Sequence, residues 1–215
     1  MIRFGMKQWA EPILVTAVLA VFIGAATIRA QQGPAPSGVP TVTVGQQEGV
    51  PEHRHKWLMG SDFDLAPMVE HGFSSGGFLG RDGWRASDMW STRTAPSFLV
   101  KNGFGDRQTD SYALRVDRFV GGKRNNLEGL WVGVGGDYWR NRIRTSESMQ
   151  RVKYHDFMLT AGSGYRYMLS RHVYLDPWVG GHFVAAGQRT ITFSGQIYHQ
   201  PVCTPEASVK LGFSF

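Results

Sequence analysis

The chain has 215 residues, of which 27 are glycine and one is cysteine, and it carries 23 Lys and Arg against 17 Asp and Glu. A lone cysteine, Cys203, closes no internal disulfide, and without a CxxC or HExxH pattern the sequence gives no indication of a structural zinc site. Glycine at about twice its average frequency disfavours a coiled coil or a helical repeat, which leaves a composition suited to β-sheets with tight bends.

Residues 1–30 have the three parts of a secretory signal peptide. Arg3 and Lys7 form the positive start, residues 12–26 are apolar and uncharged, and Ala30 precedes the expected cut. The alternative is a retained inner-membrane anchor, since residues 12–28 are barely long enough to span. Cleavage reduces the 23 basic and 17 acidic residues to 20 and 16, so the mature net charge is +4 rather than +6. The chain has no basic run interleaved with aromatics, so we expect no nucleic-acid partner.

Residues 31–54 form a stretch rich in Gln, Gly, Pro and Ser. This composition predicts a flexible spacer, because it leaves little to pack into a core. Within it, Val39 to Val44 is short and apolar enough to form an edge strand.

From Trp57 onward the chain alternates apolar and polar residues, the period of a β-strand with two different faces. The pattern is clearest at the end, where the odd positions from Pro205 to Phe215 are apolar and the even ones are polar or glycine. Asp88 and Arg118 interrupt the apolar side of their segments. The predicted strands are 57–65, 83–93, 109–120, 127–141, 155–167, 173–186 and 205–215.

Short and long connections alternate between these strands. Residues 121–126 and 169–172 are turns, whereas 142–152 and 187–203 are longer and more polar. A closed barrel needs an even number of strands, so an eighth must come from Val39 to Val44 or from residues 66–108. The glycine-rich part of that second range, 68–80, is compatible with either a loop or a short helix.

Two architectures share this alternation. A soluble sandwich or periplasmic lipocalin-like barrel turns its apolar face inward, whereas a membrane barrel turns it toward lipid. The polar face carries Trp131, Trp139 and Trp178, which suits a narrow filled lumen better than a hydrated surface. The apolar face has tyrosines near strand ends, as an interfacial girdle requires. We therefore predict a membrane barrel, with five glycines of the polar face leaving room beside these tryptophans: Gly133, Gly135, Gly162, Gly164 and Gly180.

The end of the chain resembles the carboxy-terminal assembly signal of bacterial outer-membrane proteins, through Val209, Leu211, Phe213 and Phe215. Together with the signal peptide and the length after the spacer, the chain resembles the small, eight-stranded outer-membrane barrels. The resemblance implies an all-β fold, an antiparallel up-and-down transmembrane β-barrel of eight strands spanning 55–215. It also implies the outer membrane of a Gram-negative cell, with outer-membrane lipid, lipopolysaccharide and the assembly machinery as partners. It brings no known activity.

Charged side chains on the polar faces predict a polar network in the lumen, because buried charges must be paired or solvated. This network either seals the barrel or provides a narrow path for a ligand or ions. An open porin would need about sixteen strands. The predicted network comprises Asp62, Asp64, Arg85, Arg115, Asp117, Asp137, Asp156, Arg166, Asp176, His182, Glu206 and Lys210.

The predicted function is a non-enzymatic role in envelope integrity, surface interaction or small-solute handling. Two alternatives are a soluble periplasmic lipocalin-like barrel that binds a ligand, and a lipid-modifying enzyme acting on lipid A or phospholipid. The enzyme would need a histidine with a serine and an orienting group. The candidates are His182, His155, Ser163 and Ser111, with Asp156 or Asp176, and no motif links them. His155 and Ser163 lie about 26 Å apart on one strand and cannot touch. We therefore predict no catalytic residues, no cofactor and no metal, and interpret Cys203 as an isolated loop thiol.

Overall fold

The computed structural model describes residues 56–95, 100, 104–145, 151–193 and 195–215. The predicted signal peptide, the spacer and the candidate strand from Val39 to Val44 lie outside these residues.

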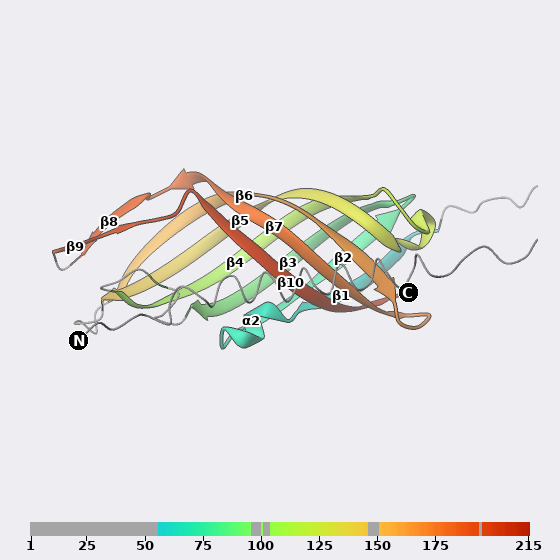
Figure 1. The fold of residues 1–215 in the computed structure, drawn as a ribbon, viewed down its shortest axis with the longest axis horizontal. Helices are drawn as coiled ribbons and strands as arrows, with labels where there is room; N and C mark the ends of the chain where they lie inside the picture. Colours follow the sequence, from blue (N-terminus) through green and yellow to red (C-terminus); the bar gives the residue numbers. More distant parts are fainter. Residues whose placement is uncertain (1–55, 96–99, 101–103, 146–150, 194) are drawn as a thin grey trace, which may run out of the picture.

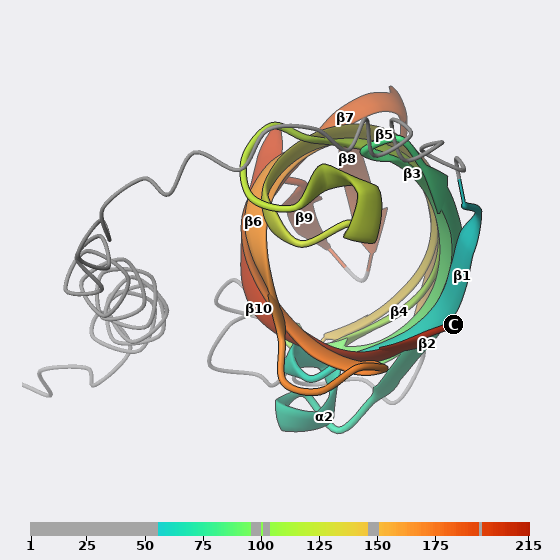
Figure 2. The ribbon, with the colours of Figure 1, turned by 90° about the vertical axis from the view of Figure 1, so that its right-hand side faces the viewer.

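Eight strands form a closed antiparallel barrel (Figures 1 and 2), which confirms the predicted fold class. Around the ring the order is β1-β10-β7-β6-β5-β4-β3-β2, and the barrel closes where β10 pairs with β1. Each predicted segment contains a strand. The strands are β1 Leu58–Asp64, β2 Phe73–Arg81, β3 Trp84–Ala95, β4 Phe104–Phe119, β5 Gly129–Thr145, β6 Arg151–Met168, β7 Val173–Gly187 and β10 Cys203–Ser214.

The apolar faces of the strands point outward. Leu114 is 69% exposed and Val134 is 64% exposed, which would be costly in water and is expected against lipid. Aromatic residues border this band on both sides. Along β6, the ten residue steps from Tyr167 to Phe157 span about 26 Å of height for a strand tilted by about 40°, which matches the apolar band of transmembrane barrels.

The eighth strand is β2, within residues 66–108. The range 68–80, for which the sequence predicts a loop or a short helix, contains the last two residues of a short helix, α2 (Ala66–Val69), and most of this strand. β2 lacks clear alternation because Phe78 lies inside the barrel, against Tyr174, rather than outside. Its turn into β3 consists of Asp82 and Gly83, both with positive φ, the combination that two-residue hairpins favour.

Two stretches expected to be long loops are largely β-structure. Most of residues 142–152 belongs to β5 and β6, which extend beyond the apolar band. Residues 187–203 contain a separate hairpin, β8 (Thr190–Phe193) paired with β9 (Gln196–His199). The two ends of the barrel therefore differ. We call the end with both described chain ends the terminal rim, and the end with the β8–β9 hairpin the loop rim (Figure 1).

The described helices are α2 and a 3₁₀ turn, η2 (Arg124–Asn126), which lies over the opening at the terminal rim (Figure 2, yellow-green). Within the described ranges, no helix is both long enough and apolar enough to cross a membrane.

Candidate functional site

The interior of the barrel is the candidate site, and its structure begins with a buried carboxylate near the terminal rim. Asp176, on β7, accepts hydrogen bonds from Arg85 Nη1 at 2.9 Å and from Trp131 Nε1 at 2.6 Å. Arg166 Nε lies 3.6 Å from the same carboxylate. None of these side chains is more than 1% exposed. Asp176 thus ties β7 to β3 on the opposite wall and to β5 and β6 beside it.

The cations around Asp176 are held as much by aromatic rings as by carboxylates. The guanidinium of Arg166 lies 3.7 Å from the ring centre of Tyr174, and that of Arg115 lies 4.7 Å from the ring centre of Trp178. Arg85 also reaches Asp117 at 2.7 Å. Such stacking is worth more when the cation is desolvated, so it offsets part of the cost of burial.

Two further aspartates complete this layer from β1. Asp62 accepts a hydrogen bond from the hydroxyl of Tyr174, and Asp64 accepts one from Trp178 Nε1 at 3.1 Å and another from Ser208. Lys210 lies 5.2 Å from the ring centre of Trp178. The layer thus combines four cations with four carboxylates: Arg85, Arg115, Arg166 and Lys210 with Asp62, Asp64, Asp117 and Asp176.

Several glycines make room for this layer, but not all of them as expected. A Cβ at Gly164 would lie 2.6 Å from the ring of Trp131, and one at Gly180 would lie 2.9 Å from the ring of Trp178. Gly162 also faces Trp178. The expectation is wrong for Gly133 and Gly135, which lie against Asp117 and Arg115 instead of a tryptophan. The cause is the registry of β4 and β5, which places these charged side chains beside the glycines.

A second cluster lies farther toward the loop rim, around His182. Its Nδ1 is 2.5 Å from Asp137 and its Nε2 is 2.7 Å from Glu206. Thr160 donates a hydrogen bond to Asp137 at 2.5 Å. An imidazole donates hydrogen bonds from both ring nitrogens only as an imidazolium. With a carboxylate at each ring nitrogen, His182 fits this arrangement as a cation between Asp137 and Glu206.

Arg93 joins this cluster and was missed from the sequence. Its guanidinium lies 3.4 Å from Glu206 and 3.7 Å from Glu70, and 5.1 Å from the ring centre of Trp139. Arg93 has the same parity as Arg85 on β3, so alternation could have identified it. Glu70 follows α2 outside any strand, and no sequence pattern indicated it.

The structure places all twelve predicted network residues inside the barrel and brings eleven of them into these two clusters. Asp156 stands apart, because its partner is Asn141, which donates to it at 2.8 Å and accepts from Thr109 at 2.8 Å. The predicted assembly residues, in contrast, lie on the outward side of β10: Val209, Leu211, Phe213 and Phe215.

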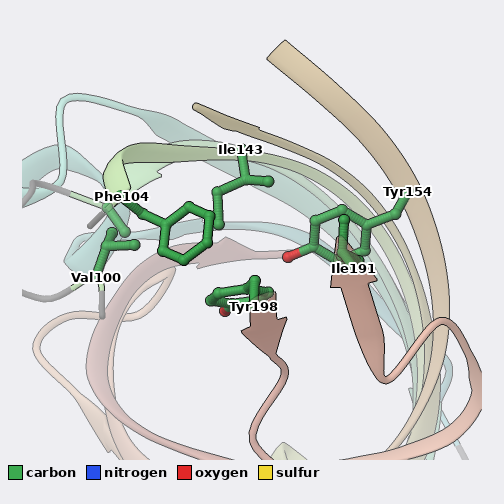
Figure 3. Close-up of a cluster of buried hydrophobic side chains, with 7 residues drawn as sticks. Val100, Phe104, Ile143, Tyr154, Ile191 and Tyr198 are labelled. Carbon is green, nitrogen blue, oxygen red and sulfur yellow. The ribbon is translucent and has the colours of Figure 1, made fainter. Parts of the chain in front are cut away.

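An apolar cluster lies at the loop rim (Figure 3). Ile191 from β8 and Tyr198 from β9 pack onto Phe104, Ile143 and Tyr154, from the extended parts of β4, β5 and β6. The rings of Phe104 and Tyr198 meet edge to face with centres 5.2 Å apart. The β8–β9 hairpin therefore docks onto the inner wall of the barrel extension.

Two cavities border these clusters. The cavity beside His182 and Glu206 has a volume of about 50 Å³, room for one or two waters. A larger hollow, of about 460 Å³, lies at the terminal rim and is lined by the turns there, among them Asn125 and His172. Within the described ranges, no group of three or more His, Cys, Asp or Glu side chains could hold a metal ion.

The residues considered for an enzyme are distributed over both surfaces of the wall. His155 lies outside, where its Nδ1 is 2.9 Å from the hydroxyl of Tyr138. Ser163 is eight positions away on the same strand, opposite Val179. Ser111 lines the small cavity with His182, whose hydrogen-bond partners are Asp137, Thr160 and Glu206.

Two solved structures resemble this barrel. The N-terminal β-barrel domain of Pseudomonas aeruginosa OprF is 14% identical, with a TM-score of 0.48 over 75% of this chain and 98% of that one. Neisserial surface protein A (NspA) is 10% identical, with a TM-score of 0.45 over 74% of this chain and 96% of that one. No protein-family model matches the sequence, and no curated protein matches it. The likeness to each solved structure is one of barrel fold.

Proposed function

We propose that the protein is a closed, non-enzymatic barrel of the Gram-negative outer membrane, which supports the envelope and presents the loop-rim extension at the cell surface. The proposal favours envelope integrity and surface interaction over the passage of small solutes. It orients the terminal rim, with its short turns, toward the periplasm, and the loop rim outward.

The filled interior carries this proposal. From one rim to the other, the lumen holds a charged aromatic layer around Asp176, the His182 cluster and the apolar cluster with Tyr198. Paired buried charges and stacked rings make up these layers, and the cavity beside His182 and Glu206 has a volume of about 50 Å³. The interior of an eight-stranded barrel is just wide enough for side chains to fill. We infer that the side chains of these layers block the lumen along most of the length of the barrel.

Planar bilayers test the closure directly. The full chain, folded into bilayers, is expected to give no stable conductance steps, because buried ion pairs and aromatic rings occupy the lumen around Asp176. A sixteen-stranded porin under the same conditions supplies the positive control, and heat-modifiable gel migration verifies that the protein is folded. Reproducible ohmic steps from the folded protein would overturn the closed-barrel proposal.

We further propose that the assembly machinery reads the last strand. Phe215 is exposed beyond the end of β10, and its backbone exchanges hydrogen bonds of 2.9 and 3.1 Å with Met59, at the closing seam between β10 and β1. Phe215→Ala keeps this backbone pairing and removes only the outward ring. We expect less heat-modifiable barrel in the outer-membrane fraction of expressing cells, but normal refolding of the purified variant.

The matched control for assembly is Phe183→Ala, which removes an outward ring of similar exposure from the neighbouring strand β7 and leaves the last strand unchanged. Equal outer-membrane levels for the Phe215→Ala variant and the wild type would show that the terminal ring is not read.

A further inference from the structure

Basic side chains gather on the outer surface of β5 and β6, beyond the apolar band on the loop-rim side. We call this surface the basic patch; it consists of Arg140, Arg142, Arg144, Arg151 and Lys153. On β5 the arginines are alternate residues and so share one face of the sheet. His155, at the near edge of the patch, faces the same way.

The registry between the two strands sets like charges opposite one another. Arg142 pairs with Lys153, and Arg144 pairs with Arg151. Directly opposed like charges destabilise a sheet, and the side chains lie about 5 Å apart at Cβ. A negatively charged group bound to this surface would offset the repulsion between the opposed side chains.

The protein itself supplies only part of this negative charge. On β4, Asp110 accepts a hydrogen bond from Arg142 at 3.1 Å, and Asp106 accepts one from Arg144 at 3.1 Å. Within the described residues, Arg151 and Lys153 form no ion pair with a carboxylate, and both are exposed. The described pairing of β6 with β7 begins only at Asp156, so these two residues stand on a part of β6 that β7 does not flank.

The depth of the patch fits a lipid headgroup region. Tyr112 and Tyr138 face outward at the loop-rim edge of the apolar band, and Arg140 lies 5.5 Å from the ring centre of Tyr112. Arg140, Arg142 and Arg144 follow Tyr138 at intervals of two residues. For a strand tilted by about 40° they lie about 5, 10 and 15 Å above the tyrosine, at and just beyond the depth of the headgroups.

We propose that the basic patch binds the phosphate groups of lipid A in the outer leaflet. This proposal rests on the orientation given under the proposed function. Arg142 and Lys153 face one lipid A phosphate at headgroup depth, and the neighbouring pair Arg144 and Arg151 extends the same contact just beyond that depth. Guanidinium groups suit this role because they bind phosphate oxygens in a bidentate manner.

Native mass spectrometry of the full chain in detergent, with bisphosphorylated lipid A added over a concentration series, tests the assignment. The test variant is Arg151→Gln with Lys153→Gln, since neither residue is engaged by a described carboxylate. We expect at least a tenfold rise in the lipid A Kd, because each Lys or Arg near an anionic surface strengthens binding severalfold.

Two control variants separate charge from fold. Arg151→Lys with Lys153→Arg preserves both charges and should bind lipid A within about twofold of the wild type. Arg124→Gln with Arg171→Gln removes the same charge from exposed residues at the terminal rim and should also bind normally. Heat-modifiable migration of every variant verifies that the barrel is closed.

The lipid arms identify the source of the phosphate. Dephosphorylated lipid A and phosphatidylglycerol should each bind at least tenfold more weakly, and inorganic phosphate at matched concentration should not displace lipid A. The assignment is overturned if the Gln variant binds like the wild type, if phosphatidylglycerol or dephosphorylated lipid A binds equally well, or if free phosphate displaces the lipid. None of these results would change the conductance expected of the folded barrel, so the planar-bilayer measurement tests the closed-barrel proposal independently.

Discussion

Replacing Asp176 with alanine is expected to lower the free energy of unfolding by about 3–5 kcal/mol, the usual cost of breaking a buried ion pair on one side. Asp176 is fully buried and lies within 2.9 Å of Arg85, while Trp131 Nε1 donates to it at 2.6 Å. Its removal leaves a buried guanidinium with one carboxylate fewer and an indole N–H without its acceptor. Urea unfolding from lipid vesicles, followed by tryptophan fluorescence, measures the change.

An asparagine at position 176 separates the loss of the negative charge from the loss of the hydrogen-bond acceptor. Asp176→Asn keeps an acceptor for Trp131 but removes the negative charge, so an intermediate loss is expected. The control is Asp82→Asn at the turn between β2 and β3, where the aspartate pairs with Arg81 at 3.2 Å and both side chains are well exposed. Exposed pairs contribute about 0–1 kcal/mol, and asparagine tolerates the positive φ of Asp82. A loss below about 1 kcal/mol for Asp176→Ala would contradict the central role given to this carboxylate.

Gly164→Ala is expected to cost about 1–3 kcal/mol by overpacking the lumen. The added Cβ would lie 2.6 Å from Cζ2 of Trp131 and 2.7 Å from the carbonyl oxygen of Pro177. Neither atom moves freely, because Asp176 holds the indole and the carbonyl belongs to the strand backbone. The same urea unfolding in vesicles measures the loss.

The matched control is Gly121→Ala, where the nearest atom to the new Cβ would be Cβ of Leu130 at 3.6 Å. Here the substitution should be neutral or stabilise by up to about 1 kcal/mol, since alanine loses less chain entropy on folding. In a Trp131→Phe background the cost of Gly164→Ala should shrink, because the contact with Cζ2 disappears while that with Pro177 remains. Equal effects at Gly164 and Gly121 would show that the lumen is not tightly packed around Trp131.

Strand alternation predicted much of this interior. Asp176, Trp178 and His182 differ by even numbers along one segment, so they had to share a face wherever that segment formed a strand. The same rule indicated which face of β10 carries Glu206 and Lys210. It would have indicated Arg93 as well, since the residue keeps the parity of Arg85 across the polar end of β3.

Other parts of the chain carried no readable pattern. In β2 the buried Phe78 breaks the alternation. The Asp82-Gly83 pair, whose positive φ angles mark the hairpin turn there, was not among the predicted turns. Residues 187–203 look polar because the β8–β9 hairpin is covered on one side alone. Ile191 and Tyr198 become buried only because the hairpin packs against the inner wall formed by the extended parts of β4, β5 and β6.

The sequence by itself determined the period of two, and with it the class of fold and the side of the wall on which each charged residue lies, because side-chain direction in a strand is a local property. Only the tertiary structure decided which charges meet. Arg85 and Asp176 are 91 positions apart and lie on opposite walls, so their contact depends on the closure of the ring and on the registry of every strand between them. The same registry opposed the basic residues of β5 and β6, which local sequence cannot indicate because it depends on how two strands slide past one another.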